Sequence, residues 1–132
     1  MRMKMVAVML ALMGAVVLAV SNAHFVGVPL ISVVDSTVFT SGKVAGLGNV
    51  EQITVTLTGF AECVNRGKNK PAASNKESFS VEGTFPVQNG KALFQLSLDA
   101  VFEPPCSPPM TVAWSNISVT VTATDGTFLT YP

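Results

Sequence analysis

Hydrophobic and polar residues alternate along several segments of the chain. In EQITVTLTGF (51–60), aliphatic residues alternate with polar ones, most of them threonines, and the same alternation returns in 77–85 and 91–98. A period of two residues is typical of a half-buried strand. No sustained helical periodicity follows residue 24. The pattern therefore predicts that this part of the chain is built of β-strands.

The segment 110–123 alternates in two different phases. Its apolar residues fall on one parity and then on the other: Met110, Val112 and Trp114, followed by Ile117, Val119 and Val121. A slip of one residue turns the apolar set to the opposite face of a strand. We therefore expect a bulge or bend at Ser115–Asn116, with Trp114 facing the core.

Turn-forming residues separate the expected strands. TSGK (40–43), GLGN (46–49), QNGK (88–91) and TDGT (124–127) contain the glycine, Asn-Gly and Asp-Gly steps that tight turns favour. The proline-rich segment 103–110 suits an extended connection better than a central strand. About seven short strands in one domain predict an all-β fold, an antiparallel β-sandwich with an immunoglobulin-like arrangement. A small β-barrel is the alternative.

The first 23 residues have the pattern of a secretory signal peptide. Arg2 and Lys4 give a positive start, an apolar run fills 6–20, and small residues occupy the junction Ser-Asn-Ala. The run is shorter than the roughly 20 residues that a membrane-spanning helix needs. We expect export with cleavage after Ala23, and cleavage after Ser21 is the alternative.

The segment 24–132 then remains as a single domain. It is expected outside the cytoplasm, either secreted or, in a Gram-negative cell, periplasmic, with no membrane attachment after the signal peptide is removed. Cys63 and Cys106 both lie in this exported part. Two thiols in an oxidising compartment most simply form a disulfide, which would stabilise the fold by about 4 kcal/mol through lost chain entropy. Two cysteines and one histidine are too few for a structural zinc site.

Charge limits the class of partner. Loss of Arg2 and Lys4 leaves six basic residues against eight acidic ones, which excludes a strongly basic nucleic-acid binder. Most of the remaining cations cluster in VNRGKNKPAASNK (64–76): Arg66, Lys68, Lys70 and Lys76. This segment is a candidate contact for an anionic cell-surface or matrix polysaccharide. The alternative is a solvated loop whose charges keep a sheet edge soluble.

His24 is the single histidine of the chain. Cleavage after Ala23 would give His24 a free α-amine beside its imidazole, a nitrogen pair that suits Cu(II). With no second histidine, Met110, Glu103 or a backbone nitrogen would have to complete the site. The alternative is that His24 begins the first strand while Phe25 packs inward. Apart from this copper site, the sequence indicates no cofactor.

Residues for catalysis are scarce. A nucleophile needs a base within hydrogen-bond reach, and the single histidine stands close to the expected signal junction. The carboxylates are scattered without a spacing that marks a catalytic pair. The sequence therefore disfavours an enzyme.

Several motifs resemble a group of short, uncharacterised secreted bacterial proteins. They are the start His-Phe after the signal, AGLGN (45–49), the loop CVNRGKNKPAASNK (63–76) and a second cysteine before prolines, CSPP (106–109). The chain departs from the group at Arg66 and Lys68, where the group's loop is rich in neutral Asn and Gly. The resemblance implies a secreted β-rich domain and no particular activity. Together these features predict an exported binding or structural module.

Overall fold

The computed structural model describes residues 22–65 and 75–132. Within these ranges the regular structure consists of strands, without an α-helix. The strands are β2 (His24–Phe25), β3 (Leu30–Val34), β4 (Thr37–Ala45), β5 (Gln52–Val64), β6 (Lys76–Pro86), β7 (Ala92–Asp99), β8 (Thr111–Thr122) and β9 (Phe128–Tyr131).

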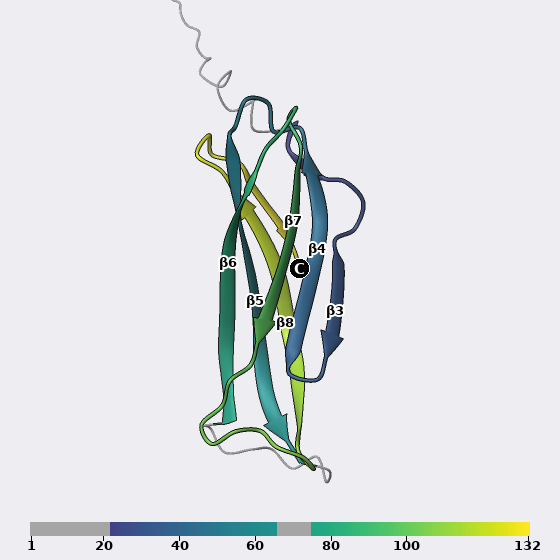
Figure 1. Cartoon of the computed structure of the whole chain (residues 1–132), viewed down its shortest axis with the longest axis vertical. Coiled ribbons are helices and arrows are strands. Elements are labelled where there is room, and N and C mark those ends of the chain that lie inside the picture. The colour runs from purple at the N-terminus through teal and green to yellow at the C-terminus, as the bar shows by residue number, and fades with distance from the viewer. Residues whose placement is uncertain (1–21, 66–74) are drawn as a thin grey trace, which may run out of the picture.

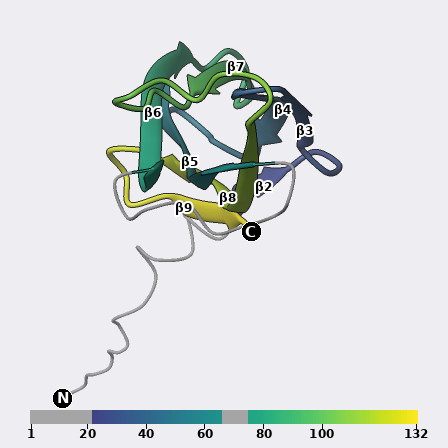
Figure 2. The ribbon, with the colours of Figure 1, turned by 90° about the horizontal axis from the view of Figure 1, so that it is seen from below.

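The strands form two antiparallel sheets that pack face to face (Figures 1 and 2). In the first sheet β4 is central, with β7 on one side and both β2 and β3 on the other. The second sheet has the order β6-β5-β8-β9. No strand pairing within the described ranges joins the two sheets. The predicted antiparallel β-sandwich is confirmed, and the alternative of a closed barrel is wrong.

The core lies between the two sheets and follows the predicted alternation. On β5 every second residue from Ile53 to Cys63 is buried, whereas the threonines between them face outward. These residues pack against inward side chains of both sheets, among them Val38, Val44, Phe94, Leu98, Val119 and Val121. Phe25 also packs inward, with its ring 6.3 Å from that of Phe94.

A bulge interrupts β8 at the expected place. Thr58 of β5 lies opposite Ser118, but Phe60 lies opposite Ser115, so β8 carries one extra residue. Asn116 accommodates it with a φ of 54°. This confirms the prediction, and the phase change in the sequence is its cause.

Trp114 uses the space that Gly59 leaves on the neighbouring strand. A Cβ atom on Gly59 would lie 2.9 Å from Cε3 of the indole, so a larger residue there would displace the ring. The ring also packs edge-on against Phe79 at 6.2 Å. The predicted core position of Trp114 is therefore confirmed.

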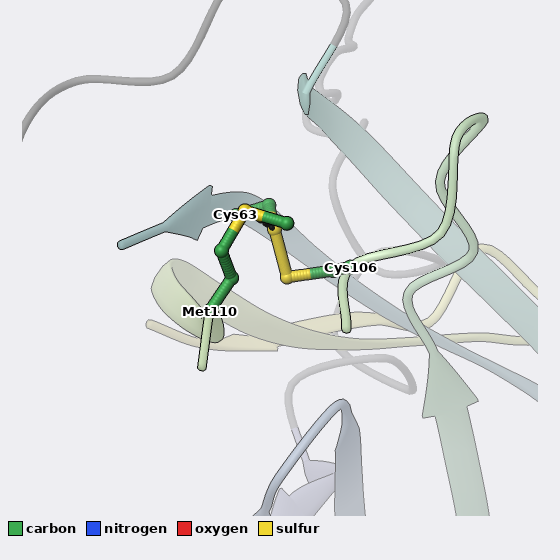
Figure 3. The surroundings of a disulfide bond; sticks show 3 residues. All are labelled: Cys63, Cys106 and Met110. Carbon is green, nitrogen blue, oxygen red and sulfur yellow. Dashed lines mark hydrogen bonds between the residues drawn. A yellow bond between two sulfur atoms is a disulfide. The ribbon is translucent and has the colours of Figure 1, made fainter. Parts of the chain in front are cut away.

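A disulfide joins Cys63, near the end of β5, to Cys106 in the connection between β7 and β8 (Figure 3). It was predicted and is confirmed. Sδ of Met110 lies 3.7 Å from Sγ of Cys63. Because Cys63 is disulfide-bonded and has no thiol proton, this is a packing contact. With Ala61 and Phe102 the disulfide forms a second, smaller core cluster at this end of the sandwich.

The opposite end contains the AGLGN motif, which forms the turn between β4 and β5. Gly46 has a φ of +76°, and a Cβ atom there would lie 1.9 Å from the carbonyl oxygen of Asn22. Leu47 is buried, and so is Ala23, which is 8% exposed and belongs to the main core. The motif thus provides the surface on which the start of the described chain packs.

Candidate functional site

The predicted site residues do not converge. His24 lies on β2 opposite Ala45, at the end of the sandwich where β4 ends. Lys76 begins β6 opposite Glu62, at the other end. The other three cations of the basic segment, Arg66, Lys68 and Lys70, lie outside the described residues, as does the expected signal peptide up to residue 21.

Two of the supplementary copper ligands considered from the sequence are excluded. Met110 packs on the disulfide, and Glu103 belongs to the same connection between β7 and β8. Both lie near the end of β5, whereas His24 lies near the end of β4, and these two strand ends are at opposite ends of the sandwich (Figure 1). The assignment of Met110 or Glu103 to a site with His24 is therefore wrong.

The imidazole of His24 is exposed and turns back along the chain. Its Nδ1 lies 2.8 Å from the carbonyl oxygen of Asn22. A carbonyl only accepts, so this contact requires the proton on Nδ1. Nitrogen and oxygen groups of residues 22–24 therefore lie close together at the start of β2.

Titratable groups in the described part of the chain form no metal-type cluster. His, Cys, Asp and Glu residues there do not gather in groups of three or more that could hold a metal. One carboxyl has a clearly altered pKa: hydrogen bonds from the hydroxyl and the backbone N–H of Thr127, at 2.6 and 3.0 Å, lower the pKa of Asp125. These bonds order the turn between β8 and β9.

The outer face of the first sheet is the most distinctive surface. Val38, Thr40 and Val44 of β4 are buried in the sandwich, so the odd-numbered residues of β4 and their cross-strand partners point outward. Four large apolar side chains on this outer face are 44–70% exposed: Leu30, Val34, Phe39 and Leu93. We call them the apolar face.

The apolar face reaches the edge of the sheet. In the described part of the chain β3 pairs with β4 alone, so its other edge is open. Val33, on the inward parity of β3, is still 48% exposed because it lies at this edge. Beside it a shallow groove runs between the turn of Asp35 and Ser36 and the segment 106–112. Apolar surface thus continues from the outer face, around the edge of β3, towards the disulfide.

Comparisons give no relative from which a function could be transferred. No protein-family model, no curated protein and no solved structure matches the chain. Within the described ranges, no helix is long and apolar enough to span a membrane. The functional argument therefore rests on the surfaces themselves.

Sequence reasoning missed the apolar face. The strand LISVV (30–34) is apolar on both sides, so it gives no clean alternation that would separate an inner from an outer face. The informative signal was available: Phe39 and Leu93 stand at outward positions in strands whose other residues alternate correctly. Large exposed apolar residues grouped on one face indicate an interaction surface.

Proposed function

We propose that the protein is exported and acts outside the cytoplasm as a binding or structural module, through the apolar face and the open edge of β3. The observation that carries this proposal is the grouping of Leu30, Val34, Phe39 and Leu93 on one outer face. A sheet edge of this kind accepts an additional strand, and adjacent apolar side chains provide the contact area. The scarcity of catalytic residues supports a binding role over an enzymatic one.

Export is supported by the charged start, the apolar run and the small residues at the junction. The Cys63–Cys106 disulfide is consistent with an oxidising compartment. The burial of Ala23 favours cleavage after Ser21, because cleavage after Ala23 would remove a core residue. N-terminal sequencing of the exported protein tests this: Asn-Ala-His is expected, and a product that retains Met1 would contradict export.

We also infer that the sandwich is immunoglobulin-like. The support is the order of its strands. The chain passes between the sheets from β4 to β5, from β6 to β7 and from β7 to β8, while β5–β6 and β8–β9 are neighbours within one sheet. β2 and β3 both pair with the same side of β4, so the first sheet of four strands is only three strands wide, and it faces the four-stranded second sheet, as in domains of that arrangement.

The role of the apolar face is tested by retention on the cell envelope of the source organism. The double variant Leu30→Thr/Phe39→Thr should lose most retention, because threonine preserves strand propensity while removing apolar contact area. A matched control, Thr56→Ser/Thr120→Ser, changes the outer face of the other sheet and should bind as wild type does. Equal retention of wild type and the apolar-face variant would contradict the proposed surface.

An anionic polysaccharide is the ligand class that the basic segment suggests. Arg66, Lys68, Lys70 and Lys76 place four cations within eleven positions of an otherwise mildly acidic chain. Retention on immobilised dextran sulfate should fall steeply with salt, because exposed charges are screened beyond about 8 Å at physiological ionic strength.

A matched pair of variants separates this segment from general charge. Lys68→Gln/Lys70→Gln should elute at lower salt than wild type, whereas Lys43→Gln/Lys91→Gln removes the same charge elsewhere and should elute near wild type. Identical elution of the two variants would contradict this ligand class and support the alternative that the basic segment is a solvated loop.

Copper binding at His24 is the second candidate function, and it comes from a different class. The position of Nδ1 beside residue 22 favours it. If cleavage follows Ser21, the amine of Asn22, the amide nitrogens of Ala23 and His24, and Nδ1 provide four nitrogens for square-planar Cu(II). If cleavage follows Ala23, His24 provides its amine and imidazole.

Titration with Cu(II) distinguishes these forms. Protein beginning at Asn22 should bind one equivalent with a four-nitrogen visible spectrum, and protein beginning at His24 should bind more weakly. His24→Ala in the longer form should abolish that spectrum. An unchanged spectrum in His24→Ala would end the copper assignment.

A further inference from the structure

The backbone groups on the open edge of β3 follow from the pairing of β4. The N–H of Ala100 donates to the carbonyl of Ser36 at 2.9 Å, on the side of β7. The N–H of Val26 donates to the carbonyl of Lys43 at 2.8 Å, on the side of β2 and β3. In an antiparallel ladder these directions alternate, so the odd-numbered residues of β4 bond towards β3.

Their partners on β3 are Leu30, Ser32 and Val34. The N–H and C=O groups of Ile31 and Val33 therefore point away from β4, towards the open edge. Leu30, Val33 and Val34 are 62%, 48% and 53% exposed. The strand contains no charged residue and no proline, which are the usual means of keeping an exposed edge unpaired. The backbone groups on this edge can therefore form hydrogen bonds with an additional strand.

We propose that the partner is a second copy of this chain, with the two β3 strands paired antiparallel about a two-fold axis at Ser32. This proposal rests on the proposed role of the apolar face and open edge, and it names their occupant. The pairing places Ile31 opposite Val33 of the second copy, and Leu30 opposite Val34 of the second copy. The first sheets of the two copies then join into one continuous sheet.

Three features of the strand favour a second copy over an unrelated partner. The sequence LISVV has the same apolar-apolar-polar-apolar-apolar pattern in both directions, so it is complementary to itself. The open backbone groups belong to Ile31 and Val33, which the two-fold axis at Ser32 places opposite each other. The N–H and C=O groups of Ile31 and Val33 in the two copies can thus form four backbone hydrogen bonds in a single register.

The third feature concerns side chains and charge. Leu30, Val34 and Phe39 share the outer face, so pairing brings the apolar residues of both copies into one strip. The nearest charge, Asp35, follows the strand. The two copies of Asp35 would lie at opposite ends of the pairing, about 20 Å apart at about 3.4 Å per residue. That separation exceeds the screening length of about 8 Å, so they do not oppose pairing.

The pairing is short, and this sets the kind of association. A five-residue strand buries less surface than the roughly 1,200 Å² of a standard stable interface. We therefore expect a reversible dimer whose population rises with concentration. Sedimentation velocity of the exported, disulfide-bonded protein should show one boundary that moves from monomer to dimer as concentration is raised.

Crosslinking tests the register. In the proposed pairing the two Ser32 residues are direct neighbours, about 4.5 Å apart between Cα atoms, within the range that a disulfide spans. Ser32→Cys should therefore form an intermolecular disulfide in air. In Leu30→Cys the two cysteines would lie about 14 Å apart, and this matched control should stay uncrosslinked. Equal crosslinking of both variants, or crosslinking of neither, would overturn the register and with it the proposal.

Blocking the edge tests the backbone contacts. Val33→Pro removes an N–H that faces only the open edge, so the β3–β4 ladder is retained and dimerisation should weaken at least tenfold. Phe128→Thr removes an exposed apolar residue from β9 of the second sheet, away from the apolar face and from this edge, and should dimerise as wild type does. A wild-type protein that stays monomeric at about millimolar concentration overturns self-pairing but leaves the envelope-retention result to decide the proposed function separately.

Discussion

The outer faces of the two sheets expose different kinds of side chain to solvent. On the second sheet, threonines of β5 stand opposite polar partners on β8: Thr54 with Thr122, Thr56 with Thr120, and Thr58 with Ser118. These side chains keep the high strand propensity of a β-branched residue while offering a hydroxyl to water. One large apolar side chain is strongly exposed on this face, Phe128 of β9, opposite Thr122. On the first sheet four such side chains are exposed: Leu30, Val34, Phe39 and Leu93.

Side-chain hydrogen bonds occur on both outer faces. On the second sheet the hydroxyl of Thr56 donates to Glu82 at 3.5 Å, and those of Ser118 and Thr130 are 3.4 Å apart. On the first sheet the hydroxyl of Thr37 donates to Asp99 at 2.6 Å, beside Val34. Among the described residues, the two faces therefore differ in the number of large exposed apolar side chains, four against one. Large exposed apolar residues grouped on one face indicate contact with another molecule.

The largest expected effect comes from removing the disulfide that joins β5 to the connection between β7 and β8. The double variant Cys63→Ala/Cys106→Ala should lose about 4 kcal/mol of unfolding free energy, because the crosslink closes a long loop in the unfolded chain. Its sequence separation is 43 residues. Urea denaturation of the variant and of wild type measures the loss. A cost below about 1 kcal/mol would show that the smaller core cluster is held by packing alone.

An effect of similar size distinguishes the inner from the outer side of β5. Leu57→Ala opens a cavity at a fully buried position and should cost about 2–5 kcal/mol. The adjacent outward change Thr56→Ala should cost within about 0.5 kcal/mol, like most surface substitutions. Thermal and urea unfolding of the pair give both values. Similar costs for the two variants would contradict the inward and outward assignment of this strand.

Exchanging chemistry between the outer faces should change association more than stability. Phe39→Thr gives the first sheet the residue type that the second sheet carries on its outer face, and it should change the unfolding free energy by about 1 kcal/mol or less. Its retention on a hydrophobic column should fall clearly. Thr56→Phe is the reciprocal change and should raise retention. A retention unchanged in both variants would mean that the exposed aromatic does not determine the surface character.

The sequence predicted those strands that have one solvent-exposed face and one buried face. Strands β5, β6, β7 and β8 were visible as alternation, and the phase change at Ser115–Asn116 located the bulge. The same reasoning failed at β3, because a strand that is apolar on both sides has no period to read. It also failed for the candidate site.

The reason lies in topology. The apolar face is assembled from β3, β4 and β7, and β7 reaches β4 only after the chain has crossed twice between the sheets. No local sequence pattern indicates that Phe39 and Leu93 share the outer face of one sheet. The assignment of Met110 as a copper ligand was wrong for the same reason. Met110 and His24 are compatible in chemistry, but they lie at opposite ends of the sandwich.

The smallest expected effect concerns the turn between β8 and β9, at the edge of the polar sheet. Hydrogen bonds from the hydroxyl and the backbone N–H of Thr127 hold the pKa of Asp125 below its ordinary value of 3.8. A carboxyl whose pKa is lowered by folding stabilises the folded state above its unfolded pKa, and this contribution is lost as the pH falls through the folded pKa. Wild type should therefore lose a small stability increment as the pH falls below about 4. Asp125→Asn should lack that increment at pH 7 and show a flatter profile below pH 4. Parallel profiles for the two proteins, measured by urea midpoints, would show that the ionised carboxylate contributes nothing to this turn.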